Sequence, residues 1–202
     1  PTLSLHALAQ PVADFARDNP VVRLDMRQAH SQILADMLHE AQVDVALGPP
    51  EIASRAPGAS SCILFKSPMV ILASRYHPLA GRMAVTRTDL EAARWALHQP
   101  GSGIRIAADQ LLAQIGLGES LQANELPSNM ILSLLRMGDH LAVVPRYVLA
   151  TTSLAGELVQ IDSGEAQVSL SHAAVWTDRS ATPAVGRFVE HMRHALNRLG
   201  EI

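Results

Sequence analysis

The chain has 202 residues, 48% of them hydrophobic and 3% aromatic, and a formal net charge of -3 at pH 7. This length fits one large domain or two small ones, and the apolar fraction predicts a packed core rather than disorder. A domain that binds nucleic acid by itself usually has a basic face and a high pI, so a pI of about 6.3 argues against unaided DNA binding.

Strand and helix patterns alternate in the first quarter of the chain. Residues 22–26 have a period of two and predict a strand, and residues 44–47 predict a second, short apolar strand. Between them, Ser31 is placed to cap an amphipathic helix. A strand, a helix and a strand in this order predict a parallel pair with a right-handed crossover.

The same pattern returns in the middle of the chain. Residues 95–98 predict a strand, and Ser102 is then placed to cap a helix. A further helix opens at Ser128, with Gly138 as its expected C-terminal residue, and residues 141–144 predict the next strand. We therefore expect a second α/β block.

The last helix has the clearest signal. Thr182 is its predicted cap, and Pro183 stands at the first helical position, ahead of a long apolar stripe. A second N-terminal signal lies at Thr88, where the spacing to Glu91 predicts a capping box with a purely structural role.

Extended apolar segments separate the two α/β blocks. They lie at residues 62–65 and 69–72, and again at residues 158–161. This arrangement predicts an α/β fold of two Rossmann-like lobes joined by two crossover strands, with a cleft between the lobes. The expected bounds are residues 1–70 for the first part of lobe I, 71–154 for lobe II, and 155–202 for the return to lobe I with the C-terminal helix.

Ser and Thr residues gather at the predicted helix starts, namely Thr2, Ser4, Ser31, Ser102 and Ser128. Helix N-termini present free N–H groups and the positive end of the helix dipole, and ligands of open α/β sheets bind at the carboxyl ends of strands. Helix starts that face one cleft would form a site for a small anion, such as a carboxylate. Simple helix capping also explains these residue types.

The histidines have different expected roles. His30 and His98 each lie at the end of a predicted strand, next to a capped helix, where a neutral imidazole could donate to a carboxylate or be an ordinary half-buried loop side chain. His191 and His194 lie three apart on the last helix without a carboxylate or cysteine at ligand spacing, so we interpret them as surface residues rather than metal ligands. The proline after His77 fixes the backbone, and we interpret His77 as structural.

Neither catalysis nor a membrane anchor is expected. Cys62 is the only cysteine and lies in an apolar segment, which favours an inert thiol and a reducing cytoplasm. No Gly-x-Ser-x-Gly elbow, phosphate-binding loop, signal peptide or run of about 20 apolar residues occurs. We therefore expect a cytoplasmic protein with no catalytic residue, no cofactor and no metal. Because the sequence begins with Pro1 rather than Met, we also expect it to be a piece of a longer protein.

The order of these segments resembles the effector-binding domain of LysR-type transcriptional regulators. Four stretches carry the resemblance: PTLSLHALAQPVADFARDNPVVRLDM (residues 1–26), SQILADMLHEAQVDVAL (31–47), MVILASRYHPLAG (69–81) and LPSNMILSLLRMGDHLAVVPRYVL (126–149). Together they cover nearly the whole chain. One departure is Ala41, where this family often has glycine.

This resemblance implies a type 2 periplasmic-binding-protein-like fold and a small metabolite that binds between the lobes and shifts their relative position. Carried over by position, the effector contacts would be Thr2, Ser4, His30, Ser31, Gly101, Ser102, Ser128 and Asn129. Arg105 would supply a positive charge, or it is a solvated helix arginine. The resemblance also implies homodimers, tetramers of the full-length protein, and DNA binding only through an N-terminal winged helix-turn-helix domain that this chain lacks.

Two alternatives stay open at this point. A solute-binding protein of a transporter shares the two-lobe architecture, although residues 77–80 and 137–145 favour the regulator. An enzyme on the same architecture would use His30 or His98 as an acid or a base, and neither has a paired partner in the sequence.

Overall fold

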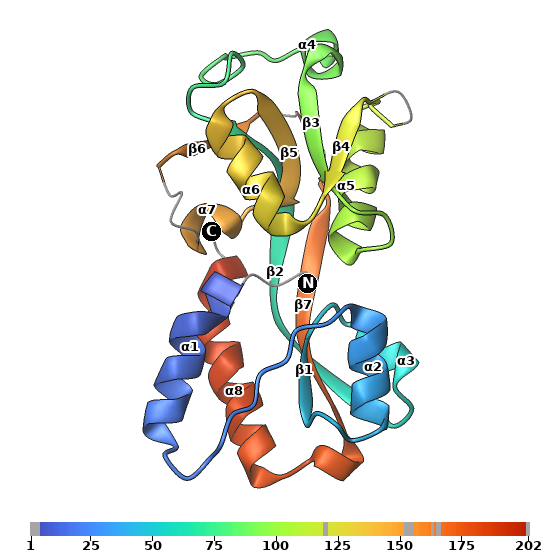
Figure 1. Cartoon of the computed structure of the whole chain (residues 1–202), viewed down its shortest axis with the longest axis vertical. Helices are drawn as coiled ribbons and strands as arrows, with labels where there is room; N and C mark the ends of the chain where they lie inside the picture. Colours follow the sequence, from blue (N-terminus) through green and yellow to red (C-terminus); the bar gives the residue numbers. More distant parts are fainter. Residues whose placement is uncertain (1–4, 119–120, 152–155, 163, 165–166, 201–202) are drawn as a thin grey trace. The chain divides into compact units, whose positions relative to one another are not determined.

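A computed structural model of the chain describes residues 5–118, 121–151, 156–162, 164 and 167–200. The chain forms two compact units: unit 1 comprises residues 1–66 and 171–202, and unit 2 comprises residues 67–170. Strands β2 (Ala59–Ser74) and β7 (Ser169–Thr177) each belong to both units (Figure 1). The predicted α/β class is confirmed. In the described part of the chain, no helix is long and apolar enough to cross a membrane.

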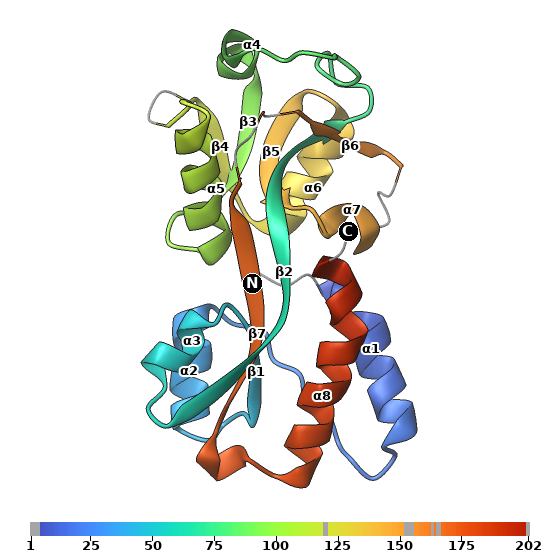
Figure 2. The ribbon, with the colours of Figure 1, turned by 180° about the vertical axis from the view of Figure 1, so that it is seen from behind.

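Unit 2 is built on a mixed sheet with the strand order β4-β3-β5-β2, to which β6 adds by pairing with β2. Strand β3 runs parallel to β4 and β5, whereas β2 runs antiparallel to β5 and β6. The bounds are β3 (Arg94–His98), β4 (Ala123–Leu126), β5 (His140–Pro145), β6 (Leu158–Ile161), α4 (Arg87–Ala92), α5 (Gly103–Gln114), α6 (Ser128–Met137) and α7 (Val148–Thr151). Helices α5 and α6 cover opposite faces of this sheet (Figures 1 and 2).

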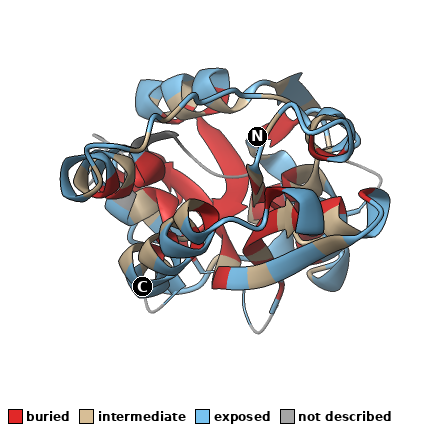
Figure 3. Cartoon of the chain, turned by 90° about the horizontal axis from the view of Figure 1, so that it is seen from below, coloured by how far each residue is buried: buried red, intermediate tan, exposed pale blue. Residues whose placement is uncertain are grey.

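The core of unit 2 lies between these helices and the central strands. Strand β5 is buried along its whole length, as expected for a central strand covered on both faces. Trp95 in β3 is fully buried, and its indole Nε1–H donates to the carbonyl of Leu90 at 2.9 Å. In Figure 3 the strands are mostly buried, and the helices are exposed on their outer faces.

Unit 1 packs its helices around the antiparallel pair of β1 (Val45–Gly48) and β7. Its helices are α1 (Leu5–Asp18), α2 (Ser31–His39), α3 (Glu51–Arg55) and α8 (Pro183–Asn197), with short 3-10 turns η1 (Asp178–Ser180) and η2 (Arg198–Gly200). Helices α1 and α8 lie side by side (Figure 2), and the rings of Phe15 and Phe188 meet edge to face with centroids 5.1 Å apart. Small and apolar side chains of α2, α3, β1 and β7 form a second core cluster.

The strand predicted at residues 22–26 is wrong, because this segment forms no regular structure. Residues 22–26 and β1 both line a cavity of about 590 Å³ in unit 1. Strand β1 pairs with β7 and stands at the end of the strand order, so residues 22–26 have no ladder partner there. The parallel pair expected between residues 22–26 and 44–47 therefore does not form. Alternation of side chains gives a strand only where a neighbouring backbone supplies hydrogen bonds.

The second connection between the units also differs from the expectation. The segment predicted to return to the first lobe is β6, but β6 pairs antiparallel with β2 from Ile71 to Ser74 and lies within unit 2. The chain returns later, through β7, and unit 1 resumes at Ser171. All four residues of β6 belong to unit 2.

Two of the predicted caps are correct and two are wrong. Ser102 Oγ accepts from the Arg105 N–H at 3.2 Å, and Thr182 caps α8 in the same way. Helix α2, however, begins at Ser31 itself, so His30 is the N-cap residue and makes no side-chain cap bond. The capping box of α4 belongs to Thr86, whose side chain and amide bond to Asp89, rather than to Thr88. In each case the helix begins at a different residue from the one that the sequence motif indicated.

The residues that follow helices α2 and α6 lead us to expect opposite effects on stability when alanine and glycine are exchanged. Ala41 follows α2 with φ 55°, and Gly138 follows α6 with φ 99°, so both residues are in the left-handed region. Glycine adopts this region without the steric cost of a Cβ atom. We expect A41G to raise the free energy of unfolding, and G138A to lower it, by about 1 kcal/mol each. Urea unfolding of the two variants checks this, and two changes of the same sign would contradict it.

Candidate functional site

The carboxyl ends of two parallel strands in unit 2 lie beside the starts of two helices. Strands β3 and β4 run in register, with His98 opposite Leu126, so both strands end at the same edge of the sheet. Helix α5 begins after β3, and helix α6 begins after β4. This edge therefore brings together polar side chains that are about 30 residues apart in the sequence.

His98 is the most buried polar side chain at this edge. Only 7% of the residue is exposed, and its Nε2 lies 3.1 Å from Ser128 Oγ. Burial, together with the nearby Arg105 guanidinium, lowers the pKa of His98 to about 4. The imidazole is therefore neutral near pH 7. Its other nitrogen, Nδ1, is buried and makes no hydrogen bond within the described residues.

The two helix starts differ in how their N–H groups are satisfied. At α5, the Ser102 hydroxyl accepts from the backbone. At α6, the N-cap residue is Pro127, which provides no side-chain acceptor. The first N–H groups of a helix lack partners within the helix, so the α6 start can still donate to a ligand. Ser128 and Asn129 occupy this first turn.

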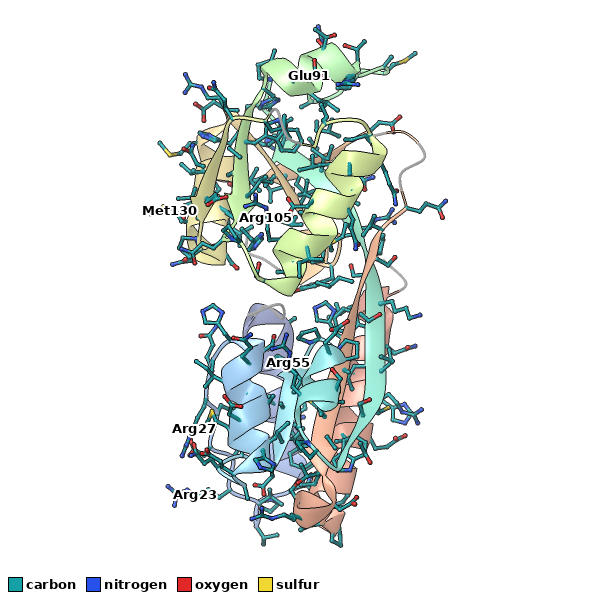
Figure 4. The ribbon with its side chains drawn as sticks, turned by 90° about the vertical axis from the view of Figure 1, so that its right-hand side faces the viewer. Arg23, Arg27, Arg55, Glu91, Arg105 and Met130 are labelled. Atoms are coloured by element: carbon teal, nitrogen blue, oxygen red, sulfur yellow. The ribbon has the colours of Figure 1, made fainter. Side chains whose placement is uncertain are left out.

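Arg105 lies between α5 and the strands, where it is labelled in Figure 4. Its Nε donates to Asp109 at 2.7 Å, and its Nη1 donates both to the His98 carbonyl and to Glu125, each at 2.9 Å. Burial opposes the charge of the guanidinium, but the hydrogen bonds of Asp109 and Glu125 outweigh it and raise the pKa of Arg105. Arg105 thus joins α5 to the ends of β3 and β4.

The residues predicted for effector contact fall into three groups. Gly101, Ser102, Arg105, Ser128 and Asn129 all lie at the start of α5 or α6 in unit 2. In unit 1, His30 is exposed at the start of α2, and Ser31 lines the cavity of that unit. Thr2 and Ser4 lie outside the described residues. The sequence marks His98 only by its position at the end of a strand, and the structure adds its hydrogen bond to Ser128.

Other histidines serve as packing and hydrogen-bonding groups. His77 Nδ1 accepts from the Leu79 N–H at 3.1 Å, so this side chain closes the turn around Pro78. Burial lowers the pKa of His77, which fits a neutral structural imidazole. His191, expected at the surface, is half-buried and lies 2.8 Å from the Pro11 carbonyl. The described residues contain no group of three or more side chains suited to a metal ion.

Comparison with solved structures identifies the fold of the chain. The chain has the type 2 periplasmic-binding-protein-like fold of the regulatory domains that it resembles. The OxyR2 E204G regulatory domain from Vibrio vulnificus has a TM-score of 0.79 at 18% identity, with 97% of this chain and 92% of that chain covered. The regulatory domain of CcmR from Synechocystis in complex with 2-PG has a TM-score of 0.74 at 18% identity, covering 93% and 89%.

The family follows from the sequence matches. The model of the LysR substrate binding domain matches residues 1–197, and the chain belongs to this family. The HTH-type transcriptional regulator CbbR of Cereibacter sphaeroides is 31% identical over 144 residues, which cover 70% of this chain and 46% of that protein. GalR of Pseudomonas putida is 31% identical over 158 residues, covering 76% and 39%. The chain thus spans less than half the length of these two regulators.

Proposed function

We propose that this chain senses a small carboxylate effector and transmits its binding to the DNA-binding part of a LysR-type transcriptional regulator. The observation that carries the ligand site is the His98–Ser128 pair at the uncapped start of α6, with His98 Nδ1 buried and unpaired. A buried nitrogen without a partner costs free energy, and such a cost is typical of a polar side chain that is held in place for a function.

The proposed contacts in unit 2 are Gly101, Ser102, Arg105, Ser128 and Asn129, with His98 added. Gly101 has a positive φ and makes the turn between β3 and α5. Helix starts and neutral donors stabilise a carboxylate by partial charges. The regulatory domain of CcmR, which has the same fold, was solved in complex with 2-PG, and this supports a small-molecule effector. In unit 1, Thr2, Ser4, His30 and Ser31 complete the proposed set of effector contacts.

In this proposal the effector acts by population shift. It must bind one arrangement of the units more tightly than another, because equal affinity for both would transmit nothing. The proposed assembly is a homodimer of this domain and a tetramer of the full-length protein in the cytoplasm. DNA is contacted only by a separate N-terminal domain. The family membership favours this reading over a transporter's solute-binding protein. An enzymatic role finds no support in the family match.

A thermal-shift screen of small carboxylates tests the proposal. A ligand that binds only the folded state raises the midpoint of unfolding in a concentration-dependent way. We expect at least one carboxylate to do so, and the full-length regulator to change its DNA affinity in the presence of the same compound. Absence of any saturable shift across aliphatic, aromatic and amino acids would contradict the carboxylate assignment.

Substitution of the helix-start serines should remove ligand binding while sparing the fold. We expect S128L to weaken the affinity for the carboxylate found in the screen by at least about tenfold, because its side chain would displace the ligand from the α6 start and break the His98 bond. S102L should act in the same direction. S133L is the matched control, since Ser133 lies exposed one turn further along α6. Unchanged affinity in both S128L and S102L would remove these residues from the site.

A further inference from the structure

The charge of Arg105 is matched by two carboxylates at the ligand-binding edge of unit 2. Asp109 Oδ1 and Glu125 Oε1 lie 2.7 and 2.9 Å from the guanidinium nitrogens, and only 18% of the Arg105 side chain is exposed. Two carboxylates against one guanidinium leave this group with one net negative charge. Arg105 therefore brings no positive charge to a ligand, although its Nη2 makes no hydrogen bond within the described residues and can still donate.

Among the described residues, the other ligand contacts proposed at this edge carry no full charge. His98 is buried and bonded to Ser128, and Ser102 and Ser128 supply hydroxyl groups. The start of α6 contributes only the partial positive charge of a helix N-terminus, roughly half an elementary charge. Such a set stabilises one negative charge. For a dianion both the attraction to these partial charges and the repulsion from the Arg105 group double, but the cost of desolvation rises with the square of the charge, so partial charges alone do not offset it.

We infer that Asp109 and Glu125 set the ligand specificity of this site, because they neutralise Arg105 and so admit a singly charged carboxylate but exclude dianions such as sulfate and phosphate esters. This inference rests on the proposed function and narrows its ligand class. It gives Arg105 the role of a positioning residue, which holds the His98 carbonyl at the end of β3 and thereby places the imidazole beside Ser128.

Sulfate is the direct probe, because it is a dianion throughout the neutral range. Calorimetric titration at low ionic strength would compare the wild-type chain, the double variant D109N/E125Q and the triple variant R105Q/D109N/E125Q. Both carboxylates are about half-exposed, so neutral amides of the same shape should leave the fold intact, which urea unfolding verifies. Low salt is needed because screening weakens exposed charges.

We expect no saturable sulfate binding to the wild type, binding to the double variant at least about tenfold tighter, and loss of this binding in the triple variant. Saturable sulfate binding to the wild-type chain would overturn the inference, and so would a double variant that gains nothing. The carboxylate screen remains a separate test. A gain of sulfate binding without any carboxylate ligand would leave the charge inference standing and remove the proposed function.

Discussion

The W95A variant should lose about 3–5 kcal/mol of the free energy of unfolding of unit 2. Trp95 is the largest fully buried side chain of the domain, and it packs among the core residues that join β3 and β5 to α5. Removing the indole leaves a cavity that rigid neighbouring strands can fill only in part. Because His98 ends the same strand, loss of this anchor should also weaken ligand binding at the start of α6.

The variant W95F separates the contribution of the packed volume of Trp95 to stability from that of its hydrogen bond. W95F keeps most of the ring but loses the bond to Leu90, whose carbonyl still accepts from the Ala93 N–H at 3.3 Å. We therefore expect W95F to cost only about 1 kcal/mol. Urea unfolding followed by circular dichroism measures both variants. Equal losses in W95A and W95F would show that the hydrogen bond, and not the packed volume, dominates.

The two tryptophans allow each unit to be followed alone. Trp95 lies in unit 2 and Trp176 in unit 1, and the chain has no other tryptophan. In W176F the fluorescence reports on unit 2, and in W95F it reports on unit 1. This matters because a protein of two compact units need not unfold in a single transition.

The local patterns predicted the elements of unit 2 well. The β3 strand, the α6 helix with Gly138 after it, and the Ser102 cap all follow from short-range signals that the structure confirms. Two helix caps were predicted a residue or two away from their true positions, and the wrong strand predictions came where a pattern depends on distant backbone. Residues 22–26 alternate like a strand but have no ladder partner, and residues 158–161 pair with β2 instead of returning to unit 1. Strand pairing is non-local, so the sequence pattern alone could not decide either case.

The helix starts of the candidate site could be predicted from the sequence, but the charge pairing around Arg105 could not. Serines at helix starts are visible in the sequence, and the position of His98 at the end of a predicted strand makes it a candidate as well. The link between His98 and Ser128 requires the register of β3 and β4. Neutralisation of Arg105 by Glu125, 20 residues away, depends on the same register. Asp109 is the exception, since its spacing of four from Arg105 on one helix predicts an ion pair.

Acid should destabilise unit 2 through His98. The pKa of His98 is lowered by burial from 6.5 to about 4 in the folded chain, so the unfolded chain binds a proton more readily. The contribution of His98 to the free energy of unfolding has its full value above pH 6.5. It falls as the pH drops from 6.5 to 4, and it stays constant below pH 4. The difference of about 2.5 pKa units corresponds to a loss of about 3 kcal/mol over this window.

H98Q isolates this contribution, because glutamine keeps a side-chain hydrogen-bonding group and does not titrate. We expect the free energy of unfolding of unit 2, followed by Trp95 fluorescence in the W176F background, to fall more steeply between pH 6.5 and 4 in the wild-type sequence than in H98Q. The Asp89 carboxyl does not affect the difference between the two chains, because its pKa of about 2 lies below this pH range and both chains contain it. Parallel curves would mean that folding does not lower the pKa of His98, which would contradict its burial away from charge-stabilising groups.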